Sequence, residues 1–366
     1  MAMTAPVSGQ ITAFFLYDVA EAVSLNRVRT LVGDAAQASR LAVRPAIPSY
    51  VQYQQPPVQL DAEALALPPI DGWTTRVKVF DYGVVSLAMT RPFAGTWSEL
   101  LAASQHLMGT GALDAAGAAA CQAVVARLGP ALEDPRHDHL SEDYFVVGVT
   151  AHEGAPTAEA LLAEHGDDIA RLLRGETEPL SPQERDEVLR HRLSYLATDL
   201  VVPSWNGAFV FDTEAGMAGA LEILEFANSQ LLQYRYYDQR LDRDLTRIYA
   251  RLQAPRWYEP WVGRRYTAAA RELHSVFIDV NDLTDRTENA LKLVGDVYAA
   301  RLLGLAAARL GLAAWKDAVK DKLKTLDDIY RFAVDQTTMD RGEIMEGSIV
   351  LILVFELILI LMGLMD

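Results

Sequence analysis

Apolar and polar residues alternate with two different periods in the first half of the chain. Several segments are rich in β-branched and aromatic residues and have the period of two that is typical of strands. They are residues 11–20, 74–93, 142–151 and 193–212. Residues 74–93 form two alternating runs around Asp81, Tyr82 and Gly83, a pattern that predicts a β-hairpin. A further strand is predicted within 48–60, where two prolines interrupt it.

Helical periodicity separates these strands. The predicted helices cover residues 24–33, 96–109, 112–128 and 157–175. Thr96 followed by Glu99 is a capping box, and Ser24 and Gly33 are a typical N-cap and stop. Short strands, short helices and direct hairpins favour a split, mostly antiparallel sheet over a doubly wound one. The predicted fold class is therefore α+β, with a mixed or antiparallel sheet domain in residues 1–214.

Strand signals nearly vanish after residue 215, and long helical patterns replace them. Helices are predicted at residues 216–252, 267–303 and 324–348. PRWYEPW, residues 255–261, separates the first two, so we expect an antiparallel helical hairpin about 50 Å long. The small residues of 304–315 predict either a kink or a closely packed segment before the third helix. Residues 215–346 are thus predicted to form a helical hairpin or coiled-coil region.

The last twenty residues, 347–366, read GSIVLILVFELILILMGLMD and form a separate apolar segment. As a helix, the seventeen residues from Ser348 to Leu364 span about 25 Å, slightly less than the roughly 30 Å hydrocarbon core of a bilayer. We expect lipid or other copies of the chain to cover this helix. The residues predicted to mediate these contacts are Glu346, Ile349, Leu353, Phe355, Glu356 and Leu359.

Insertion into lipid is favoured only narrowly. About a dozen Leu, Ile, Val and Phe contribute about −5 kcal/mol in total, and a central acid opposes insertion by about 3 kcal/mol. Glu356 would then be protonated or paired with a neighbouring helix. The alternative is a helix buried in the core of a homo-oligomer. We expect a tail-anchored protein at the cytoplasmic face of a membrane, because no signal peptide is recognisable at residues 1–20.

Composition and motifs argue against several classes of protein. A net charge of −16 argues against general nucleic-acid binding, which requires Lys and Arg to neutralise phosphates. Cys121 is the single cysteine, so no disulfide can form within the chain, and its Ala-rich surroundings predict a small buried side chain. The sequence contains no Gly-rich phosphate loop, nucleophile elbow or HExxH motif, and we predict neither a cofactor nor a bound metal.

Some acidic and histidine residues could bind metal, but each group has a simpler interpretation. His137 and His139 lie in RHDHLSED and lack a third ligand at a typical spacing, so an exposed charged loop is favoured. Asp238 and Asp242 are interleaved with arginines, as is Asp244, which predicts a salt-bridged helix face exposed to solvent. Glu222 and Glu225 lack the ExxH partner of di-iron bundles.

Aromatic and basic residues cluster in the expected hairpin turn. This cluster contains the residue types that dominate binding hot spots. Its members are Trp257, Tyr258, Trp261, Arg264 and Arg265. One hypothesis is a partner surface, and the favoured alternative is that the aromatic side chains pack the turn onto the α+β domain.

Two motifs resemble a known family. Glu346 and Glu356 stand ten positions apart around an Ile-rich run, and Phe80, Tyr82 and Gly83 lie in FDYGVVSL. Both patterns are similar to the required-for-meiotic-nuclear-division family, a domain of unknown function. Its eukaryotic members are membrane-associated mitochondrial proteins, one of them a homo-oligomer linked to translation near the inner membrane. The resemblance implies a tether without catalytic residues and, for this acidic chain, a bacterial-type member.

The expected function is therefore that of a non-enzymatic, membrane-associated homo-oligomeric scaffold or tether at the prokaryotic inner membrane. Its expected partners are other copies of the chain, lipid and a protein of unknown identity, without direct nucleic-acid binding. Two alternatives stay open. One is a soluble homo-oligomer with its tails bundled in the core. The other is a metal-dependent enzyme that uses His137 and His139, or Asp238 and Asp242.

Overall fold

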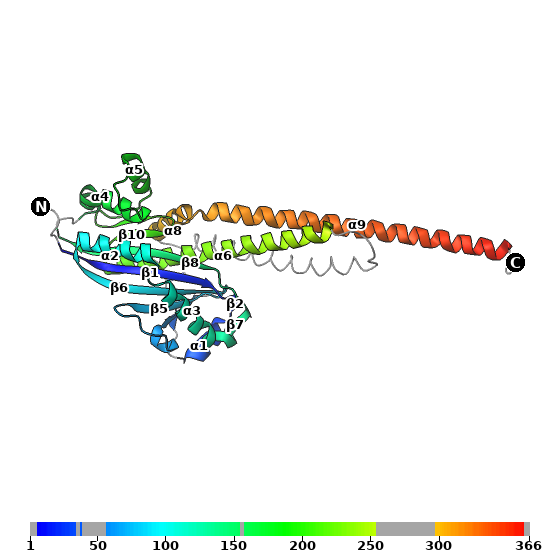
Figure 1. Cartoon of the computed structure of the whole chain (residues 1–366), viewed down its shortest axis with the longest axis horizontal. Helices are drawn as coiled ribbons and strands as arrows, with labels where there is room; N and C mark the ends of the chain where they lie inside the picture. The colour runs from blue at the N-terminus through cyan, green and yellow to red at the C-terminus, as the bar shows by residue number, and fades with distance from the viewer. Residues whose placement is uncertain (1–5, 34–36, 39–55, 154–156, 254–296, 362–366) are drawn as a thin grey trace. The chain divides into compact units, whose positions relative to one another are not determined.

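The computed structural model describes residues 6–33, 37–38, 56–153, 157–253 and 297–361 (Figure 1). Within these ranges side chains are described except in 37–38, 251–253, 330, 332–348 and 355–361. The chain divides into two compact units. The first comprises residues up to Tyr236 together with 283–316, and the second comprises 237–282 and 317–366. The domain limits expected from the sequence, 1–214, 215–346 and 347–366, stay a prediction.

A mixed sheet organises the first unit. Its strands lie in the order β3-β4-β5-β6-β1-β8-β10-β9, and β8–β10 is its one parallel pair within the described residues. The strands are β1 Pro6–Asp18, β3 Gln37–Ala38, β4 Val58–Asp61, β5 Thr74–Val79, β6 Val84–Thr96, β8 Ser141–His152, β9 Leu200–Pro203 and β10 Gly207–Phe211. A small second sheet pairs β2 Ala20–Val23 with β7 Leu132–Pro135. The predicted α+β class with a mostly antiparallel sheet is confirmed.

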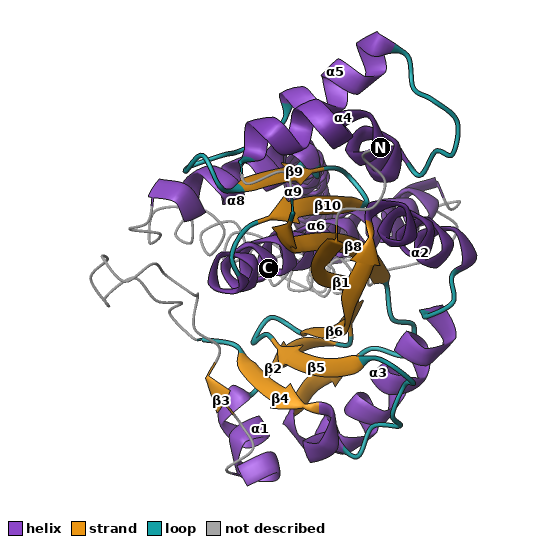
Figure 2. Cartoon of the chain, turned by 90° about the vertical axis from the view of Figure 1, so that its left-hand side faces the viewer, coloured by secondary structure: helices purple, strands orange, loops and turns teal. Residues whose placement is uncertain are grey.

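Helices account for most of the remaining described chain. They are α1 Leu25–Val32, α2 Trp97–Thr110, α3 Asp114–Leu128, α4 Ala158–Arg174, α5 Pro182–Arg190, α6 Glu214–Gln253, α8 Val297–Arg309 and α9 Leu312–Leu361. Figure 2 shows α1 and α3 beside the β4 end of the sheet, and α4 and α5 beside the β9–β10 end.

One face of the sheet carries the main apolar core. Odd-numbered residues of β1, such as Ile11 and Phe15, point to this face and pack with side chains of α2, α3 and α4. Close packing of α3 depends on Gly117, where an added Cβ would lie 3.1 Å from the Phe15 ring. Each fully buried side chain of this size contributes about 1.5–3 kcal/mol to folding.

The opposite face lies against α6. Even-numbered sheet residues, including Phe14, Leu16 and Tyr144, are buried there. At Gly148 of β8 an added Cβ would approach the sulfur of Met217 in α6 to 2.6 Å. Because the helix packs this closely, α6 and the sheet form two layers in the first unit.

Several local predictions are confirmed in detail. The capping box of α2 is present, with Thr96 and Glu99 each bonding the backbone N–H of the other. Helix α1 begins after Ser24 and ends at Gly33, although the Ser24 side chain makes no capping bond. Cys121 is buried, and burial raises the pKa of its thiol to about 12.

The strand prediction for 193–212 is correct only in its second part. Residues 200–211 form β9, a turn and β10, whereas Leu193 contributes an isolated bridge to Val201. Helix α5 was not predicted. Its start signal is present in the sequence, because Ser181 caps the helix, Pro182 is its first residue and Glu184 follows.

The described parts of the second half, 214–253 and 297–361, are mainly helical, as predicted. Helix α6 spans forty residues. The expected kink falls at Gly311, which has φ 67° and separates α8 from α9. Helix α9 continues without a break from Leu312 to Leu361. The predicted turn at 255–261 and most of the helix at 267–303 lie outside the described residues.

Candidate functional site

The apolar end of α9 is the first candidate site. Six consecutive apolar residues there are at least half exposed: Ile349 51%, Val350 59%, Leu351 70%, Ile352 56%, Leu353 57% and Val354 50%. Six consecutive residues cover more than one full helical turn, so this apolar surface surrounds the helix on all sides. A helix that is apolar all round is normally buried, within protein or within a membrane.

The other residues of the predicted contact site lie on the same helix. Glu346, Phe355, Glu356 and Leu359 belong to α9, but their side chains lie outside the described part of the structure. The hairpin-turn cluster also lies outside the described residues. Its predicted members are Trp257, Tyr258, Trp261, Arg264 and Arg265.

Hydropathy bears on whether a described helix could span a membrane. Within the part of the chain whose side chains are described, no single helix is both long and apolar enough to cross a bilayer. The pair Val297–Arg309 and Leu312–Ile329 satisfies the criterion jointly, with a bend of 63° between them.

In the second unit, an ion cluster joins α6 to α9. Lys322 Nζ lies 2.7 Å from Oδ1 of Asp238 and 2.7 Å from Oδ1 of Asp242. Asp244 pairs with Arg247 at 3.1 Å. The prediction that these aspartates form ion pairs is confirmed, although a lysine of a distant segment, rather than a neighbouring arginine, pairs with the first two. The predicted exposure to solvent is wrong for Asp244, which is buried.

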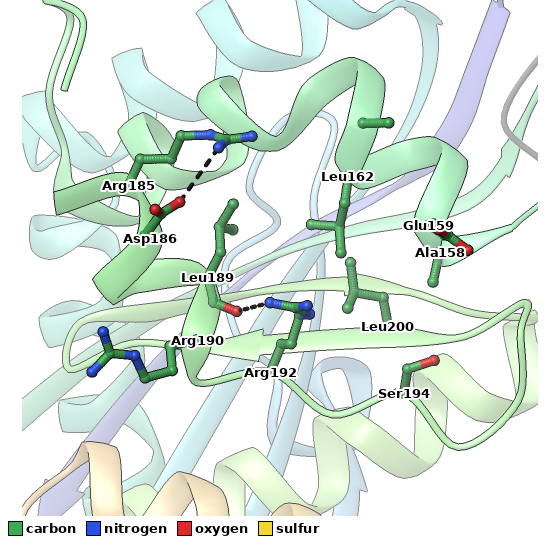
Figure 3. Close-up of a pocket in the computed structure, with 11 residues that line it drawn as sticks. Ala158, Glu159, Leu162, Arg185, Asp186, Leu189, Arg190, Arg192, Ser194 and Leu200 are labelled. Carbon is green, nitrogen blue, oxygen red and sulfur yellow. Dashed lines mark hydrogen bonds and ion pairs between the residues drawn. The ribbon is translucent and has the colours of Figure 1, made fainter. Parts of the chain in front are cut away.

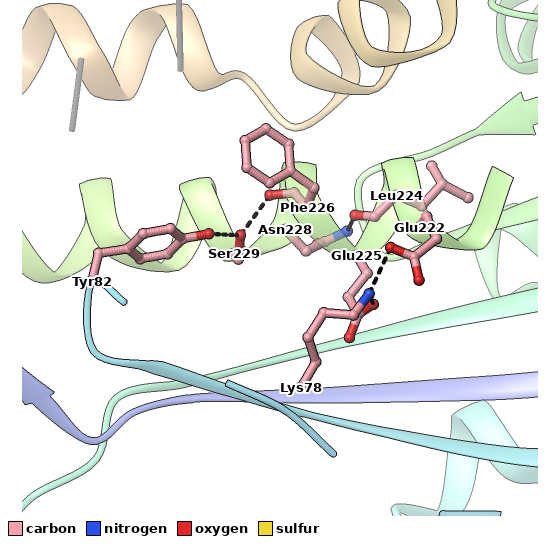
Figure 4. A network of polar contacts seen from close by, with 8 residues as sticks. All are labelled: Lys78, Tyr82, Glu222, Leu224, Glu225, Phe226, Asn228 and Ser229. Atoms are coloured by element: carbon pink, nitrogen blue, oxygen red, sulfur yellow. Dashed lines mark hydrogen bonds and ion pairs between the residues drawn. The ribbon is translucent and has the colours of Figure 1, made fainter. Parts of the chain in front are cut away.

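A buried polar layer lies between the sheet and α6 in the first unit (Figure 4). Lys78 Nζ in β5 lies 2.8 Å from Glu222 Oε2 and 2.5 Å from Glu225 Oε2. The lysine side chain is only 5% exposed. Burial opposes its charge, but the two carboxylates outweigh burial and raise the pKa of Lys78. Because both glutamates face an ammonium group, they serve as its counter-ions.

The FDYG segment lies at the same interface. The Tyr82 hydroxyl lies 2.7 Å from Ser229 Oγ of α6, and its ring stacks on buried Phe80 with centroids 5.1 Å apart. Gly83 has φ 86°, and an added Cβ there would lie 1.9 Å from the Ala20 carbonyl oxygen. The motif therefore has a structural explanation: it shapes the β5–β6 turn and attaches it to α6 and β2.

A third set of buried polar groups surrounds Asp18 at the end of β1. Its Oδ1 accepts hydrogen bonds from Gln233 Nε2 at 2.9 Å and from Arg136. The Arg136 guanidinium also lies 3.5 Å from the centroid of the Tyr236 ring. Burial raises the pKa of Asp18 to about 7, although Arg136 and Gln233 act in the opposite direction.

An open pocket of about 720 Å³ lies between α4, α5 and β9 (Figure 3). Leucines and arginines line it, including Leu162, Leu189 and Arg192. Arg185 pairs with Asp167 and Asp186, and Arg192 donates to the Leu189 carbonyl oxygen at 2.5 Å. These guanidinium groups already have partners, so the pocket offers an amphipathic surface rather than a strongly cationic one.

Two histidines face each other where β8 ends beside α4. The Nε2 atoms of His152 and His165 are 3.0 Å apart, and Glu164 lies next to them. Burial, followed by the neighbouring imidazole, lowers the pKa of His152, so its neutral form is favoured at pH 7.

The sequence-based metal candidates lie elsewhere. His137 is exposed, as the favoured loop interpretation predicts, whereas His139 is half-buried. Among the described residues, neither belongs to a group of three potential ligands, whereas His152, Glu164 and His165 form one. Sequence reasoning missed this group because its members come from a strand end and a helix face.

The mixed sheet and the helices α6, α8 and α9 that follow it in sequence define an α+β protein. Residues 8–218 match the family described as "Uncharacterized protein MJ0711, N-terminal domain", and the chain belongs to this family. A relative from Methanocaldococcus jannaschii, "Uncharacterized protein MJ0711", is 25% identical over 203 residues. The alignment covers 56% of this chain and 62% of the relative, less than two thirds of its length. No solved structure matches.

Proposed function

We propose that this protein is a non-enzymatic homo-oligomeric scaffold that the apolar end of α9 attaches to a membrane. The single observation that supports the proposal most strongly is the exposed apolar run Ile349–Val354. No other described segment has so many consecutive large apolar residues exposed.

Lipid explains this run better than a coiled-coil partner does. A helix that packs in a coiled coil needs apolar residues only along one seam, and its other faces stay polar. The run is apolar on every side, as expected for a helix that hydrocarbon surrounds. Lipid is therefore the proposed occupant, and a bundle of tails within a soluble particle is the competing outcome.

The acidic residue within the run supports self-association. Glu356 lies on α9 in the middle of the apolar segment 347–366. An ionisable group at membrane depth is costly and is usually paired with a neighbouring helix. A second copy of the chain supplies such a neighbour, which is why the proposal includes a homo-oligomer.

The resemblance to the required-for-meiotic-nuclear-division family supports the same proposal, since it implies a membrane-associated tether. The proposed attachment is at the cytoplasmic face of a prokaryotic inner membrane, as expected for a C-terminal anchor. The proposed tethering role requires a protein partner. Copurification from native membranes would identify it.

Flotation with lipid vesicles tests the proposal on the full chain. The variant Leu351→Asp/Leu353→Asp replaces two of the exposed residues. Each aspartate near the bilayer centre costs about 2.5–3.5 kcal/mol, so two exceed the net gain of about 2 kcal/mol for the whole segment. We expect the wild type to float with vesicles and the variant to stay at the bottom of the gradient.

A matched control is Lys320→Asp, which changes an exposed residue of α9 far from the apolar run. This variant should float like the wild type. A wild type that stays in the aqueous phase as a discrete oligomer would support the bundled-tail alternative and overturn the membrane proposal. Sedimentation in mild detergent tests self-association separately, because Glu356→Ala should shift the oligomer toward monomer.

A further inference from the structure

His152, Glu164 and His165 are arranged as a metal site in the first unit, independently of the proposed scaffold function. His152 is the last residue of β8, and the other two residues lie in α4. His165 Nε2 is 3.0 Å from His152 Nε2 and 3.7 Å from Glu164 Oε1. One ligand atom from each residue lies within 4.8 Å of the others. Both imidazoles are more than nine-tenths buried, with exposures of 8% and 6%.

Surrounding side chains hold the His165 ring in place. The Trp97 ring stacks on it with centroids 3.9 Å apart and an angle of 17° between the planes. Asp168 Oδ2 lies 3.8 Å from His165 Nδ1, and Trp97 Nε1 donates a hydrogen bond to the same oxygen at 3.0 Å. A carboxylate hydrogen-bonded to the ring nitrogen that does not bind metal fixes histidine ligands in metal sites, and Asp168 needs to approach by only about 0.8 Å to make that bond. It leaves His165 Nε2 directed at His152.

The distances suit a small tetrahedral cation. Zinc binds imidazole nitrogen at about 2.0–2.1 Å, so two nitrogens in a tetrahedral site lie roughly 3.4 Å apart. The observed 3.0 Å requires an opening of only a few tenths of an ångström. Two histidines with one glutamate are also a known zinc donor set, in which the fourth position stays open. Glu164 is exposed, so the open side of the site faces solvent.

We propose that His152, His165 and Glu164 bind a divalent transition-metal ion of the zinc class. Imidazole and carboxylate ligands suit Zn²⁺ and, in the same geometry, Co²⁺. Asp168 is the positioning residue, because it acts through His165.

Metal titration of the full-length protein, freed of metal by a chelator, tests the proposal. Zn²⁺ binding is measured by competition with a chromophoric chelator, and Co²⁺ reports geometry through its visible absorption. We expect one tightly bound ion per chain and a tetrahedral Co²⁺ spectrum. His165→Gln and His152→Gln should each weaken binding by at least about 100-fold, and Asp168→Asn should weaken it by about 10–100-fold.

The matched control is His137→Gln/His139→Gln, which removes two histidines outside the cluster and should leave binding unchanged. Circular dichroism checks that each variant is folded. If a histidine variant unfolds, Glu164→Gln replaces it, because this exposed side chain can change without disturbing the core. Less than one equivalent of Zn²⁺ in the wild type, an octahedral Co²⁺ spectrum, or equal loss in the control variant would overturn the proposal.

Discussion

Replacing Lys78 with methionine tests whether the buried polar layer holds α6 against the sheet. Methionine retains most of the side-chain volume but removes the charge. Glu225 is 5% exposed and Glu222 is 15% exposed, so the variant leaves two carboxylates in a poorly hydrated space without their cation. Removing one partner from a buried ion pair typically costs about 3–5 kcal/mol.

The cost of protonating a buried glutamate gives a similar loss in the free energy of unfolding. Without Lys78, the more buried carboxylate, Glu225, avoids its desolvation penalty by taking up a proton. At pH 7, protonating a glutamate of ordinary pKa costs about 3.7 kcal/mol, while the less buried Glu222 can turn toward water. We therefore expect Lys78→Met to lower the free energy of unfolding by about 4 kcal/mol at pH 7.

The stability lost in Lys78→Met should grow as pH rises from 5 to 7. Without its cation, a buried carboxylate is favoured in the uncharged form, so the variant loses stability as pH rises and protonation becomes costlier. At pH 5 the protonation cost falls to about 1 kcal/mol, and the variant should approach the wild type.

Urea unfolding followed by circular dichroism at pH 5 and pH 7 measures both effects. Lys320→Met is the control, because this lysine is exposed and its loss should change stability by less than about 0.5 kcal/mol. Adding Glu225→Gln to Lys78→Met should recover part of the loss at pH 7. A deficit below about 1 kcal/mol at pH 7, or one that does not change with pH, would refute the reasoning.

Three further predictions concern the first unit. Gly83→Ala should destabilise the fold by at least about 2 kcal/mol in urea unfolding, because the added Cβ would strain a positive φ and clash with the Ala20 carbonyl. Asp18→Asn should gain stability relative to the wild type as pH is raised from 5 to 8, since folding raises the pKa of Asp18 to about 7 and ionisation then opposes folding. Thr96→Ala should lower the free energy of unfolding by about 1 kcal/mol, measured in the same assay, through loss of the α2 cap.

Local signals in the sequence were sufficient to predict most of the described strands and helices. The hairpin at 74–93 was predictable because a Gly-containing turn separates two alternating runs, and α2 because Thr96 and Glu99 mark its start. Helix α5 escaped prediction because only Val188 and Leu189 in it are buried, so no apolar stripe accompanied its start signal.

Contacts between distant segments could not be predicted in the same way. Lys78 and Glu222 are 144 residues apart, and nothing in their local sequences indicates that they meet. His152 and His165 are separated by only thirteen residues, but their approach depends on how α4 packs beside the end of β8. The exposed apolar run of α9 was predictable, because its composition alone conflicts with contact with water.

The position of β1 in the sheet constrains how the protein is made. Its two neighbours are β6 and β8, and β8 ends at His152, so one edge of β1 stays unpaired until about 134 further residues have been translated. At ribosomal rates of about 5–20 residues per second, this delay lasts roughly 7 to 27 s. During that interval an apolar strand edge is open to pairing with other nascent chains. Newly synthesised protein should therefore depend on chaperones more than a chain whose first strand lies at the sheet edge.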